Sequence, residues 1–477
     1  MAYAMILLPL VMAALAFALP SNRWRPWLLP VTSLAHGALV AWALAHPALL
    51  TQSSWLVLDP PGRLVLVLVS VLFCASAFYT VDYLRRRAEH PNSVFCVCFL
   101  TFLSMMTLVT WSHHLGLMWV AVEATTLVSA PLIYFDRTHN SIEATWKYLL
   151  VCSIGIALAL MGSFFLAYAS LHAGLDSSLT FENLLENAPA LSRPWLYAAF
   201  VLSLVGYGTK MGLAPVHIWL PDAHSEAPSP VSALLSGALL NCAFLAILRI
   251  YHICIATGEG TFTSGPLIGI GLFSMAVAGL FMFCQRDFKR MLAYSSIEHM
   301  GILALGLGIG APALFGTLLH ILNSGLTKGV LFLSAGNIYH AYHSKSTDVV
   351  RGALRRVPLS GALFLTGFLA ITGSPPFGPF ISEFSILNAA FGASHYWAAG
   401  LFLFFLFLIF IGMGILVLKV VQGHPSEAVQ SSSYRDGGLT CVPPLLLMAL
   451  VLLLGLYIPA PLDTLIRDAV NFLEVTP

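Results

Sequence analysis

The stretch TKMGLAPVHIWLPDAHSEAPSP, Thr209 to Pro230, decides how this chain folds. It follows the apolar run WLYAAFVLSLVGYG, which predicts a buried helix. Lys210 stands at the end of this run, and Pro215 follows five residues later. A proline inside a helix removes a backbone hydrogen bond and breaks the helix. The stretch therefore predicts an interrupted helix that carries a lysine beside its break.

The composition indicates an integral membrane protein. Of the 477 residues, 58% are hydrophobic and only 9% are charged, and the mean hydropathy is +0.86. A soluble domain carries about 25% charged residues. The apolar runs reach the roughly 20 residues that a helix needs to cross a bilayer, whereas a β-barrel would show short alternating segments. We therefore predict an all-α polytopic membrane protein that has the lipid bilayer, and no nucleic acid, as a partner.

Fourteen apolar runs predict about fourteen transmembrane helices. They lie near residues 3–20, 27–50, 63–83, 94–112, 114–135, 147–171, 195–214, 230–255, 265–284, 291–310, 312–340, 359–391, 397–420 and 440–460. We expect the first run to be a retained helix, because no small-residue cleavage site and soluble domain follow it. The run at 359–391 is broken by prolines and is counted as one interrupted span.

The basic residues support this count and predict an orientation. If the N-terminus lies outside the cell, the cytoplasmic loops hold fifteen of the 22 lysines and arginines, and the opposite loops hold only Arg63, Arg193 and Arg467. Cytoplasmic loops of membrane proteins carry such an excess. Both termini are therefore predicted on the non-cytoplasmic side.

Motifs for cofactor binding are missing from the sequence. The eight cysteines form no CxxC and have no iron–sulfur or zinc spacing, so we expect them to be small packing residues. The sequence also contains no GxGxxG and no Walker A motif. We predict no cofactor, no metal site and no redox chemistry in this chain.

Several ionisable residues stand inside predicted spans. A charge near the bilayer centre costs about 2.5–3.5 kcal/mol on insertion scales, so such residues usually face a wet interior and take part in function. The candidates are Glu123, Lys147, Lys210, Glu298, His299, His320, Lys328 and Glu383. Two lysines and two glutamates suit a series of coupled proton sites, because a nearby carboxylate restores the preference of a buried lysine for its charged form.

These residues also have structural interpretations. Lys147 could simply extend to the cytoplasmic surface, and His299 could be a core histidine with satisfied hydrogen bonds. Structural ion pairing could explain Glu123, Lys210, Lys328 and Glu383. Arg249, near the outer end of its span, is expected to be an interfacial anchor. His320 and Lys328 are eight residues apart, so they share a helix face at a separation of about 12 Å that water could bridge.

Two predicted spans are interrupted by prolines. The seventh holds Lys210, and the twelfth, with TGSPPFGPFISEFSIL, holds three prolines before Glu383. They are five spans apart and so run in opposite directions, which indicates an inverted-repeat transporter with a site at mid-membrane. We predict three helices in residues 1–93, a first five-helix repeat in 94–255, a second, inverted repeat in 265–420, and a loop with the fourteenth span in 421–477.

The opening stretch acquires a role from this layout. Lys210 is expected to bind and release a proton beside a wet cavity at the helix break. PDAHSEAPSP would form a polar approach from the cytoplasm, in which His217, His224, Asp222 and Glu226 relay protons. A plain solvated loop is the alternative for the last three of these residues.

Three motifs resemble a known family. KMGLAPVHIWLPDAHSEAPSPVSALLSG, KRMLAYSSIEHMG and GLTKGVLFLSAGNIYH are similar to the proton-translocating antiporter-like subunits of respiratory complex I, Mrp sodium/proton antiporters and membrane-bound hydrogenases. The resemblance covers roughly residues 60–420. Within the family, the motif SEAPSPVSALLSG is most similar to that of hydrogenase-4 component F, a membrane subunit of formate hydrogenlyase-type complexes.

The resemblance implies a fourteen-helix core of two inverted five-helix bundles with a polar axis along the middle of the membrane. The family's fifth-helix glutamate and seventh-helix lysine, whose separation is thought to drive pumping, fall on Glu123 and Lys210. The eleventh-helix lysine falls on Lys328, and the twelfth-helix acid or base falls on Glu383.

The sequence departs from the family pattern at two positions. Asn241 stands where many members have a lysine or histidine in the eighth helix, and Ser324 stands where a histidine often precedes the eleventh-helix lysine. Because Asn241 cannot titrate, the middle of the path would rely on water, or on His320 and Glu298. We also expect no long C-terminal lateral helix, since about 17 residues follow the fourteenth span.

The expected function is that of a proton-translocating, non-redox membrane subunit of a multisubunit respiratory oxidoreductase, of the hydrogenase-4 or formate hydrogenlyase type. Its location would be the plasma (inner) membrane of a prokaryote, and its partners would be other membrane subunits and a peripheral redox arm with NiFe hydrogenase-like and iron–sulfur subunits. The ion would be H⁺, with Na⁺ as an alternative.

Some alternative hypotheses keep the predicted fold, and others assign the chain to a different class of protein. A complex I subunit, a Mrp-type Na⁺/H⁺ antiporter subunit and a membrane subunit of an inorganic-carbon uptake complex would share the architecture. A membrane-embedded enzyme would need a metal or nucleophile arrangement, and no HExxH spacing occurs. A purely structural anchor would not explain charged residues beside broken helices.

Overall fold

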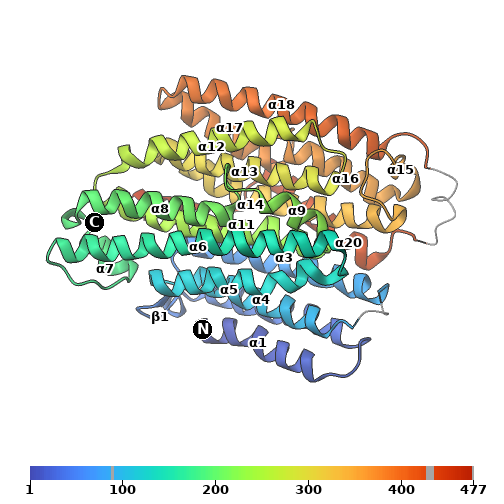
Figure 1. Ribbon diagram of the computed structural model, residues 1–477, viewed down its shortest axis with the longest axis horizontal. Coiled ribbons are helices and arrows are strands. Elements are labelled where there is room, and N and C mark those ends of the chain that lie inside the picture. Colours follow the sequence, from blue (N-terminus) through green and yellow to red (C-terminus); the bar gives the residue numbers. More distant parts are fainter. Residues whose placement is uncertain (88–90, 426–433, 475–477) are drawn as a thin grey trace.

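Helices run side by side along the long axis of the molecule (Figure 1). The computed structural model describes residues 1–87, 91–425 and 434–474; residues 426–433 of the predicted loop at 421–477 lie outside these ranges. Of the described residues, 81% are helical. The described strands are β1 (Thr51–Ser53) and β2 (Leu56–Val57), which pair antiparallel as a short hairpin. The prediction of an all-α membrane fold is confirmed.

The helices follow the predicted apolar runs. The first half contains α1 (Ala2–Ala18), α2 (Leu28–Ala45), α3 (Pro60–Arg85), α4 (Ser93–Trp111), α5 (Leu115–Ile133), α6 (His139–His172), α8 (Arg193–Met211), α9 (Trp219–Glu226), α10 (Ser229–Leu234), the π-helix η5 (Leu235–Leu239) and α11 (Leu240–Ala256). The second half contains α12 (Gly260–Met282), α13 (Phe288–Ile309), α14 (Ala311–Tyr342), α16 (Pro358–Ile371), α17 (Gly378–Gly392), α18 (Tyr396–Val421), α20 (Gly438–Leu456) and α21 (Ala460–Glu474). Short helices lie between them: η1 (Arg25–Trp27), η2 (Pro47–Leu49), η3 (Tyr134–Asp136), α7 (Phe181–Glu186), η4 (Ala188–Ala190) and α15 (Ala353–Arg356).

Many of these helices are long and apolar enough to cross a membrane. Among the described residues, 11 helices are long and apolar enough to span it, and Ala2–Ala18 and Pro358–Ile371 are shorter apolar helices. The count of fourteen spans and the two inverted repeats stay predictions. The sixth span begins earlier than expected, at His139 instead of residue 147, because the Thr138 side chain accepts a hydrogen bond from the Ser141 N–H and caps an additional polar turn.

Glycines bring neighbouring helices into close contact. A Cβ atom on Gly206 of α8 would lie 2.5 Å from the Ala159 nitrogen of α6, and one on Gly271 of α12 would lie 2.6 Å from the Gly301 oxygen of α13. Small residues permit this approach, which is how helices commonly pack in membranes. These two contacts hold together the most closely associated helix pairs, α6 with α8 and α12 with α13.

Helix α14 lies at the centre of the fold. It packs against α3, α10, α13, α16, α17 and α20, and also against the C-terminal helix α21. Its contact with η5 is backbone to backbone, since a Cβ on Gly237 would lie 2.8 Å from the Gly325 oxygen and one on Gly325 would lie 2.9 Å from the Gly237 oxygen. A π-helix is rare and occurs often at functional sites. The seam between the two halves thus contains irregular backbone on one side and α14 on the other.

Charged side chains collect at the two ends of the helices. The end that we call the basic end holds three ion pairs: Arg87–Asp136, Arg290–Asp222 and Lys345–Glu226. It lies beside α15, whereas α7 and β1 lie at the opposite end (Figure 1). The separation of these two ends agrees with the predicted placement of the loops on two sides of the membrane. That the basic end faces the cytoplasm remains a prediction.

Arg249 corrects one expectation from the sequence. It is not an interfacial anchor, because it is buried and paired bidentately with Asp59, with Nε–Oδ2 and Nη2–Oδ1 distances of 2.8 and 2.9 Å. Its remaining donors bind the backbone oxygens of Val109, Thr110 and Ser112. Asp59 is distant in the sequence, so the position of Arg249 in its helix did not reveal this partner. The pair ties the start of α3 to the ends of α4 and α11.

We predict that this buried ion pair stabilises the fold in a pH-dependent way. Burial alone would raise the pKa of Asp59, but the charge and hydrogen bonds of Arg249, with His113 and the Gly62 N–H, hold that pKa below its usual value. The stabilisation is therefore present above the pKa of Asp59 in the unfolded chain and is lost as the pH falls through its folded-state pKa. D59N and R249M should each lower the free energy of unfolding by about 3–5 kcal/mol, because each leaves one buried polar partner alone.

Thermal unfolding in detergent checks this prediction. The exposed pair Arg467–Asp463 provides the control, and R467A should leave the melting temperature unchanged. The double variant D59N/R249M should lose less stability than the sum of the single variants. Additive losses would contradict the coupling between the two residues.

We predict that Cys284 reports the orientation of the protein. It is the exposed cysteine, in the turn between α12 and α13 at the basic end, whereas the other seven are buried or partly buried. A membrane-impermeant maleimide should label it in inverted vesicles and not in right-side-out vesicles, and C284S should abolish the labelling. The matched probe S177C in the C284S background lies in the exposed loop before α7 and should show the opposite sidedness. Labelling of Cys284 from the outside would reverse the predicted orientation.

Candidate functional site

The seventh span is interrupted where the sequence predicted it. Helix α8 ends at Met211, and Gly212 follows with φ +83°, a left-handed conformation that favours glycine. Helix α9 begins at Trp219, whose indole N–H donates to the Thr209 oxygen at 2.8 Å. Ser274 of α12 accepts a hydrogen bond from the Ala214 N–H at 3.0 Å. Protein groups thus satisfy the backbone at the break, as a membrane interior requires.

The break positions Lys210 in the last turn of α8. Its side chain is completely buried. The ammonium group donates to the Tyr148 hydroxyl at 2.6 Å and to Thr126 Oγ1 at 2.8 Å, and it lies 4.5 Å from the centre of the Tyr148 ring. The Trp219 ring centre is 6.0 Å away. Lys210 therefore points into α5 and α6, with neutral hydroxyls and aromatic faces as its surroundings.

Glu123 lies close to this site without a direct hydrogen bond to the lysine. It is half-buried on α5, one turn before Thr126, and Oε1 accepts a hydrogen bond from Ser153 of α6 at 3.0 Å. Its Oε2 atom is buried without a hydrogen-bond partner among the described residues. The two residues of the expected pair thus occupy the same contact between α5 and α6, and Lys210 bonds to the hydroxyl one turn away from the glutamate.

A chain of hydroxyls continues from Lys210. The Tyr148 hydroxyl lies 2.6 Å from Ser129 Oγ, and Ser129 donates to the Thr125 oxygen at 2.7 Å. Each hydroxyl can accept one hydrogen bond and donate another. The order Lys210, Tyr148, Ser129 is therefore a connected series of exchangeable protons.

The second half contains a similar arrangement around Lys328. This lysine is buried on α14 and donates to Ser295 Oγ at 2.7 Å and to the Leu292 oxygen at 3.2 Å, both on α13. Glu298 follows Ser295 by one turn and is buried, with neither carboxylate oxygen hydrogen-bonded within the described part of the chain. In both halves a lysine bonds to a hydroxyl, and a glutamate lies one turn from that hydroxyl.

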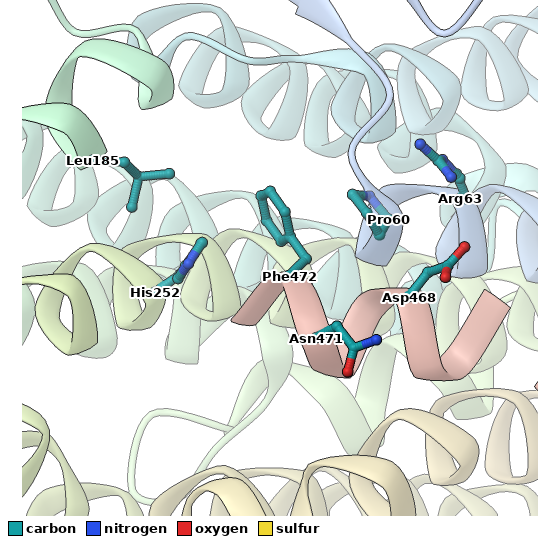
Figure 2. A pocket seen from close by; sticks show the side chains of 7 residues that line it. All are labelled: Pro60, Arg63, Leu185, His252, Asp468, Asn471 and Phe472. Carbon is teal, nitrogen blue, oxygen red and sulfur yellow. The ribbon is translucent and has the colours of Figure 1, made fainter. Parts of the chain in front are cut away.

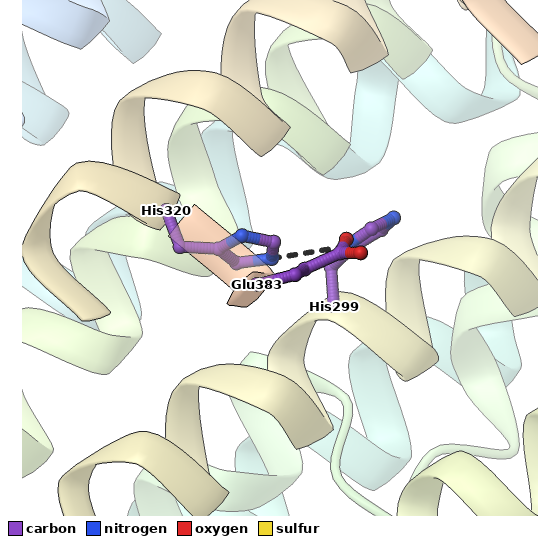
Figure 3. A group of neighbouring side chains, drawn as sticks. All are labelled: His299, His320 and Glu383. Carbon is purple, nitrogen blue, oxygen red and sulfur yellow. Dashed lines mark hydrogen bonds between the residues drawn. The ribbon is translucent and has the colours of Figure 1, made fainter. Parts of the chain in front are cut away.

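His299, His320 and Glu383 converge from α13, α14 and α17 (Figure 3). His299 Nδ1 and His320 Nε2 are 3.0 Å apart, and His320 Nδ1 lies 2.9 Å from Ser382 Oγ. Glu383 follows the second helix break, between α16 and α17, and its carboxylate lies against Gly373, where a Cβ atom would be 2.2 Å from Oε2. The predicted break of the twelfth span thus brings Glu383 to two histidines. His320 and Lys328 both contact α13.

The remaining residues of the predicted approach separate into surface and core. Lys147 is half-exposed and pairs with Glu143 at 2.6 Å and with Asp222 at 3.0 Å, which agrees with the surface interpretation. His217 is half-buried near Tyr294, with 6.5 Å between the ring centres.

His224 of the predicted approach and Asn241 are both buried. His224 lies between the rings of Trp219 and Phe332, and neither of its ring nitrogens has a hydrogen-bond partner among the described residues. Asn241 donates to the Gly237 oxygen of η5 at 2.8 Å, while its Oδ1 has no described partner. His224 thus faces α14 through Phe332, and Asn241 lies beside η5, which packs against α14.

Two pockets lie at the ends of the molecule. At the basic end, a polar pocket of about 310 Å³ includes Glu226, Asp287, Lys345 and the buried Lys289, whose ammonium donates to the Ala227 oxygen at 2.6 Å. At the opposite end, a pocket of about 500 Å³ lies beside α21. Figure 2 shows Phe472 of α21 between His252 and Pro60.

The hydroxyl partners of the lysines were not recognised in the sequence. Thr126, Tyr148 and Ser295 resemble ordinary polar residues in apolar helices, and serines and threonines are tolerated there. The spacing of Glu123 with Thr126 and of Ser295 with Glu298 was a usable signal, because residues three apart share a helix face.

The fold and these buried residues define a class: polytopic helical membrane proteins with ionisable residues beside interrupted helices. Residues 112–412 match the family model described as NADH:quinone oxidoreductase/Mrp antiporter, TM, and the chain belongs to this family of antiporter-like membrane subunits. The hydrogenase-4 component F homolog of Methylacidiphilum infernorum (isolate V4) is 36% identical over 474 residues, which covers 96% of each chain. The family assignment from the motifs is confirmed.

Two solved structures share the fold across nearly the whole chain. A chain of the membrane-bound sulfane sulfur reductase, an archaeal respiratory membrane complex, superposes with a TM-score of 0.86 at 22% identity, covering 99% of this chain and 97% of that one. A chain of the Mrp complex from Dietzia sp. DQ12-45-1b also has a TM-score of 0.86, at 20% identity, with 99% and 98% covered. At these identities the likeness concerns the fold alone.

Proposed function

We propose that this protein is a proton-translocating subunit of a multisubunit respiratory complex of the hydrogenase-4 or formate hydrogenlyase type. Its membership of the antiporter-like family supports a role in ion translocation. The similarity to a hydrogenase-4 component F homolog, which extends over 96% of both chains, favours this type of complex over the others in the family. We assign H⁺ as the ion, because the central groups are amines, which exchange protons.

The environment of Lys210 carries this proposal. Burial disfavours a charged amine, and a nearby carboxylate favours it. The hydrogen-bond partners of Lys210 are two neutral hydroxyls, and Glu123 lies one turn away on the helix that carries Thr126. A small movement of α5 relative to α8 would therefore change how strongly Glu123 stabilises the ammonium. Such a movement would switch Lys210 between holding and releasing its proton.

The proposed path runs along the middle of the protein. Protons enter from the polar pocket at the basic end, pass His224 to Lys210, and cross the seam near Asn241 to Lys328 and onward to His320 and Glu383. Because Asn241 cannot titrate, water must complete the path beside η5. The five-helix repeats at 94–255 and 265–420 would each contain one lysine site, with the basic end toward the cytoplasm.

We predict that loss of the ammonium group at position 210 stops proton movement. K210M keeps the length of the side chain and removes its exchangeable protons, so the translocation rate should fall at least about 10-fold. Y148F keeps the aromatic ring and removes one hydrogen-bonding hydroxyl, so its loss should be smaller, up to about 10-fold. The rate is measured as valinomycin-driven proton uptake into proteoliposomes that contain the purified complex.

Lys419 provides a matched control for this test. It is an exposed lysine near the end of α18, so K419M should translocate at the wild-type rate. K210R keeps a positive charge at position 210 but does not readily release a proton. It should therefore recover part of the proton uptake only if the charge alone is sufficient for translocation. Unchanged proton uptake in K210M, in a complex that assembles normally, would contradict the mechanism.

We predict that native purification identifies a hydrogenase-type partner set. The complex is extracted in mild detergent, and all co-purifying proteins are determined by mass spectrometry. The expected result is a NiFe hydrogenase-like large subunit with iron–sulfur and further membrane subunits. Flavin-bearing NADH-oxidising subunits would instead assign the chain to complex I, and a set of small membrane subunits alone would contradict the redox part of the proposal.

A further inference from the structure

The cluster of His299, His320 and Glu383 has the donor set of a transition-metal site. One ligand atom of each residue lies within 4.8 Å of those of the other two, and all three side chains are buried. His299 Nδ1 and His320 Nε2 point toward each other from facing helices (Figure 3). Two imidazoles and one carboxylate are a recurrent set of protein ligands for Zn²⁺ when a fourth position stays open.

The distances suit a small ion. Zn²⁺ binds imidazole nitrogen and carboxylate oxygen at about 2.0–2.2 Å, which places tetrahedral ligand atoms about 3.3 Å apart. The two nitrogens are already 3.0 Å apart. The carboxylate would have to approach by at most about 1.5 Å, a change within the reach of a glutamate side chain.

The other ring nitrogens lie beside groups that could orient the ligands. His320 Nδ1 lies 2.9 Å from Ser382 Oγ, and His299 Nε2 faces Glu298 Oε2 at 4.0 Å. Metal-bound histidines almost always donate their second ring N–H to a carboxylate, a backbone carbonyl or water, and a serine hydroxyl can accept a hydrogen bond in the same way. Nδ1 of His299 and Nε2 of His320 are hydrogen-bonded to each other, and both could bind the same ion once it displaces the proton between them.

Unsatisfied groups at the same place favour a cation. Within the described residues, Glu383 Oε1, both oxygens of Glu298 and His299 Nε2 lack hydrogen bonds although they are buried. Two buried carboxylates flank the histidines, and the nearby cation is the single ammonium of Lys328, which is bonded to Ser295. Buried acceptors without partners are unfavourable. A divalent ion bound by the two histidines and Glu383 would satisfy the Glu383 carboxylate and compensate the charge of both carboxylates.

We propose that His299, His320 and Glu383 form a binding site for Zn²⁺ or a divalent transition-metal ion of similar preference, with Glu298 and Ser382 orienting the histidines. Mg²⁺ and Ca²⁺ are excluded as preferred occupants, because they select oxygen ligands. Where the proposed proton path also holds, the bound ion would take the position between the two imidazoles that a proton otherwise occupies. Metal binding itself does not depend on that path.

Titration with Co²⁺ tests the site directly, because tetrahedral Co²⁺ with nitrogen and oxygen ligands absorbs strongly in the visible range. The purified, metal-stripped complex should bind one Co²⁺ at this site per chain, and Zn²⁺ should displace it with loss of the absorption. H320A and E383Q should each weaken binding at least about 100-fold, and E298Q about 10–100-fold, as expected for an orienting partner. H139A, an exposed histidine, and C284S, an exposed thiol, should leave binding unchanged.

Further measurements separate this proposal from others. Each variant is first compared with the wild type by size-exclusion chromatography and melting temperature, and H299Q provides a second ligand variant of similar size. K210M should bind Co²⁺ normally even though it fails in proton uptake, so failure of the transport mechanism would leave the metal result intact. Absence of Co²⁺ binding in the wild type, or unchanged binding in both H320A and E383Q, would overturn the metal site.

Discussion

The cost of placing an ammonium group inside a helical membrane protein governs the arrangement around Lys210. Low local dielectric makes an uncompensated charge expensive, so each atom that faces the lysine matters. The protein supplies two hydroxyls and the faces of two aromatic rings. Trp219 belongs to this group only because the chain turns back after Gly212, so the helix break and the lysine site are one feature. The packing of α6 on α8 through Gly206 then fixes the distance between them.

A buried lysine that donates to a hydroxyl occurs in both halves of the chain, with different surroundings. Lys210 and Lys328 each donate to a hydroxyl on a neighbouring helix, with a glutamate one turn away. In the first half the lysine precedes its helix break. In the second half the break precedes Glu383, which meets two histidines. The first site is surrounded by hydroxyl groups, and the second continues into stronger proton and metal ligands, so the two halves are chemically different.

Much of the fold could be predicted from the sequence, because its main determinants are local. The length of an apolar run sets a membrane span, and prolines at 215 and 375–376 mark both interruptions. The buried positions of Lys210, Lys328 and Glu383 also followed from their place inside apolar runs. These inferences need no knowledge of which helices are neighbours.

The contacts between helices could not be predicted in the same way. Arg249 looked like an interfacial residue because Asp59 belongs to another helix, and the histidine–glutamate cluster combines three helices. Glu123 and Lys210 were expected as a pair, but their hydroxyl neighbours depend on how α5, α6 and α8 pack. Helix α21 was not predicted, because its segment is short and of mixed polarity. Its apolar residues do recur at helical spacing, and they are buried where the helix packs on α3 and α14.

The close approach of Gly237 and Gly325 has a mechanical consequence. With no side chain between the two backbones, α14 and the π-helix η5 have nothing compressible at their contact, so neither can shift by a change of rotamer. If α14 moved along its axis, either η5 would move with it or the two backbones would slide past each other. Any coupling between the two lysine sites that crosses this contact would therefore pass through backbone rather than through side chains.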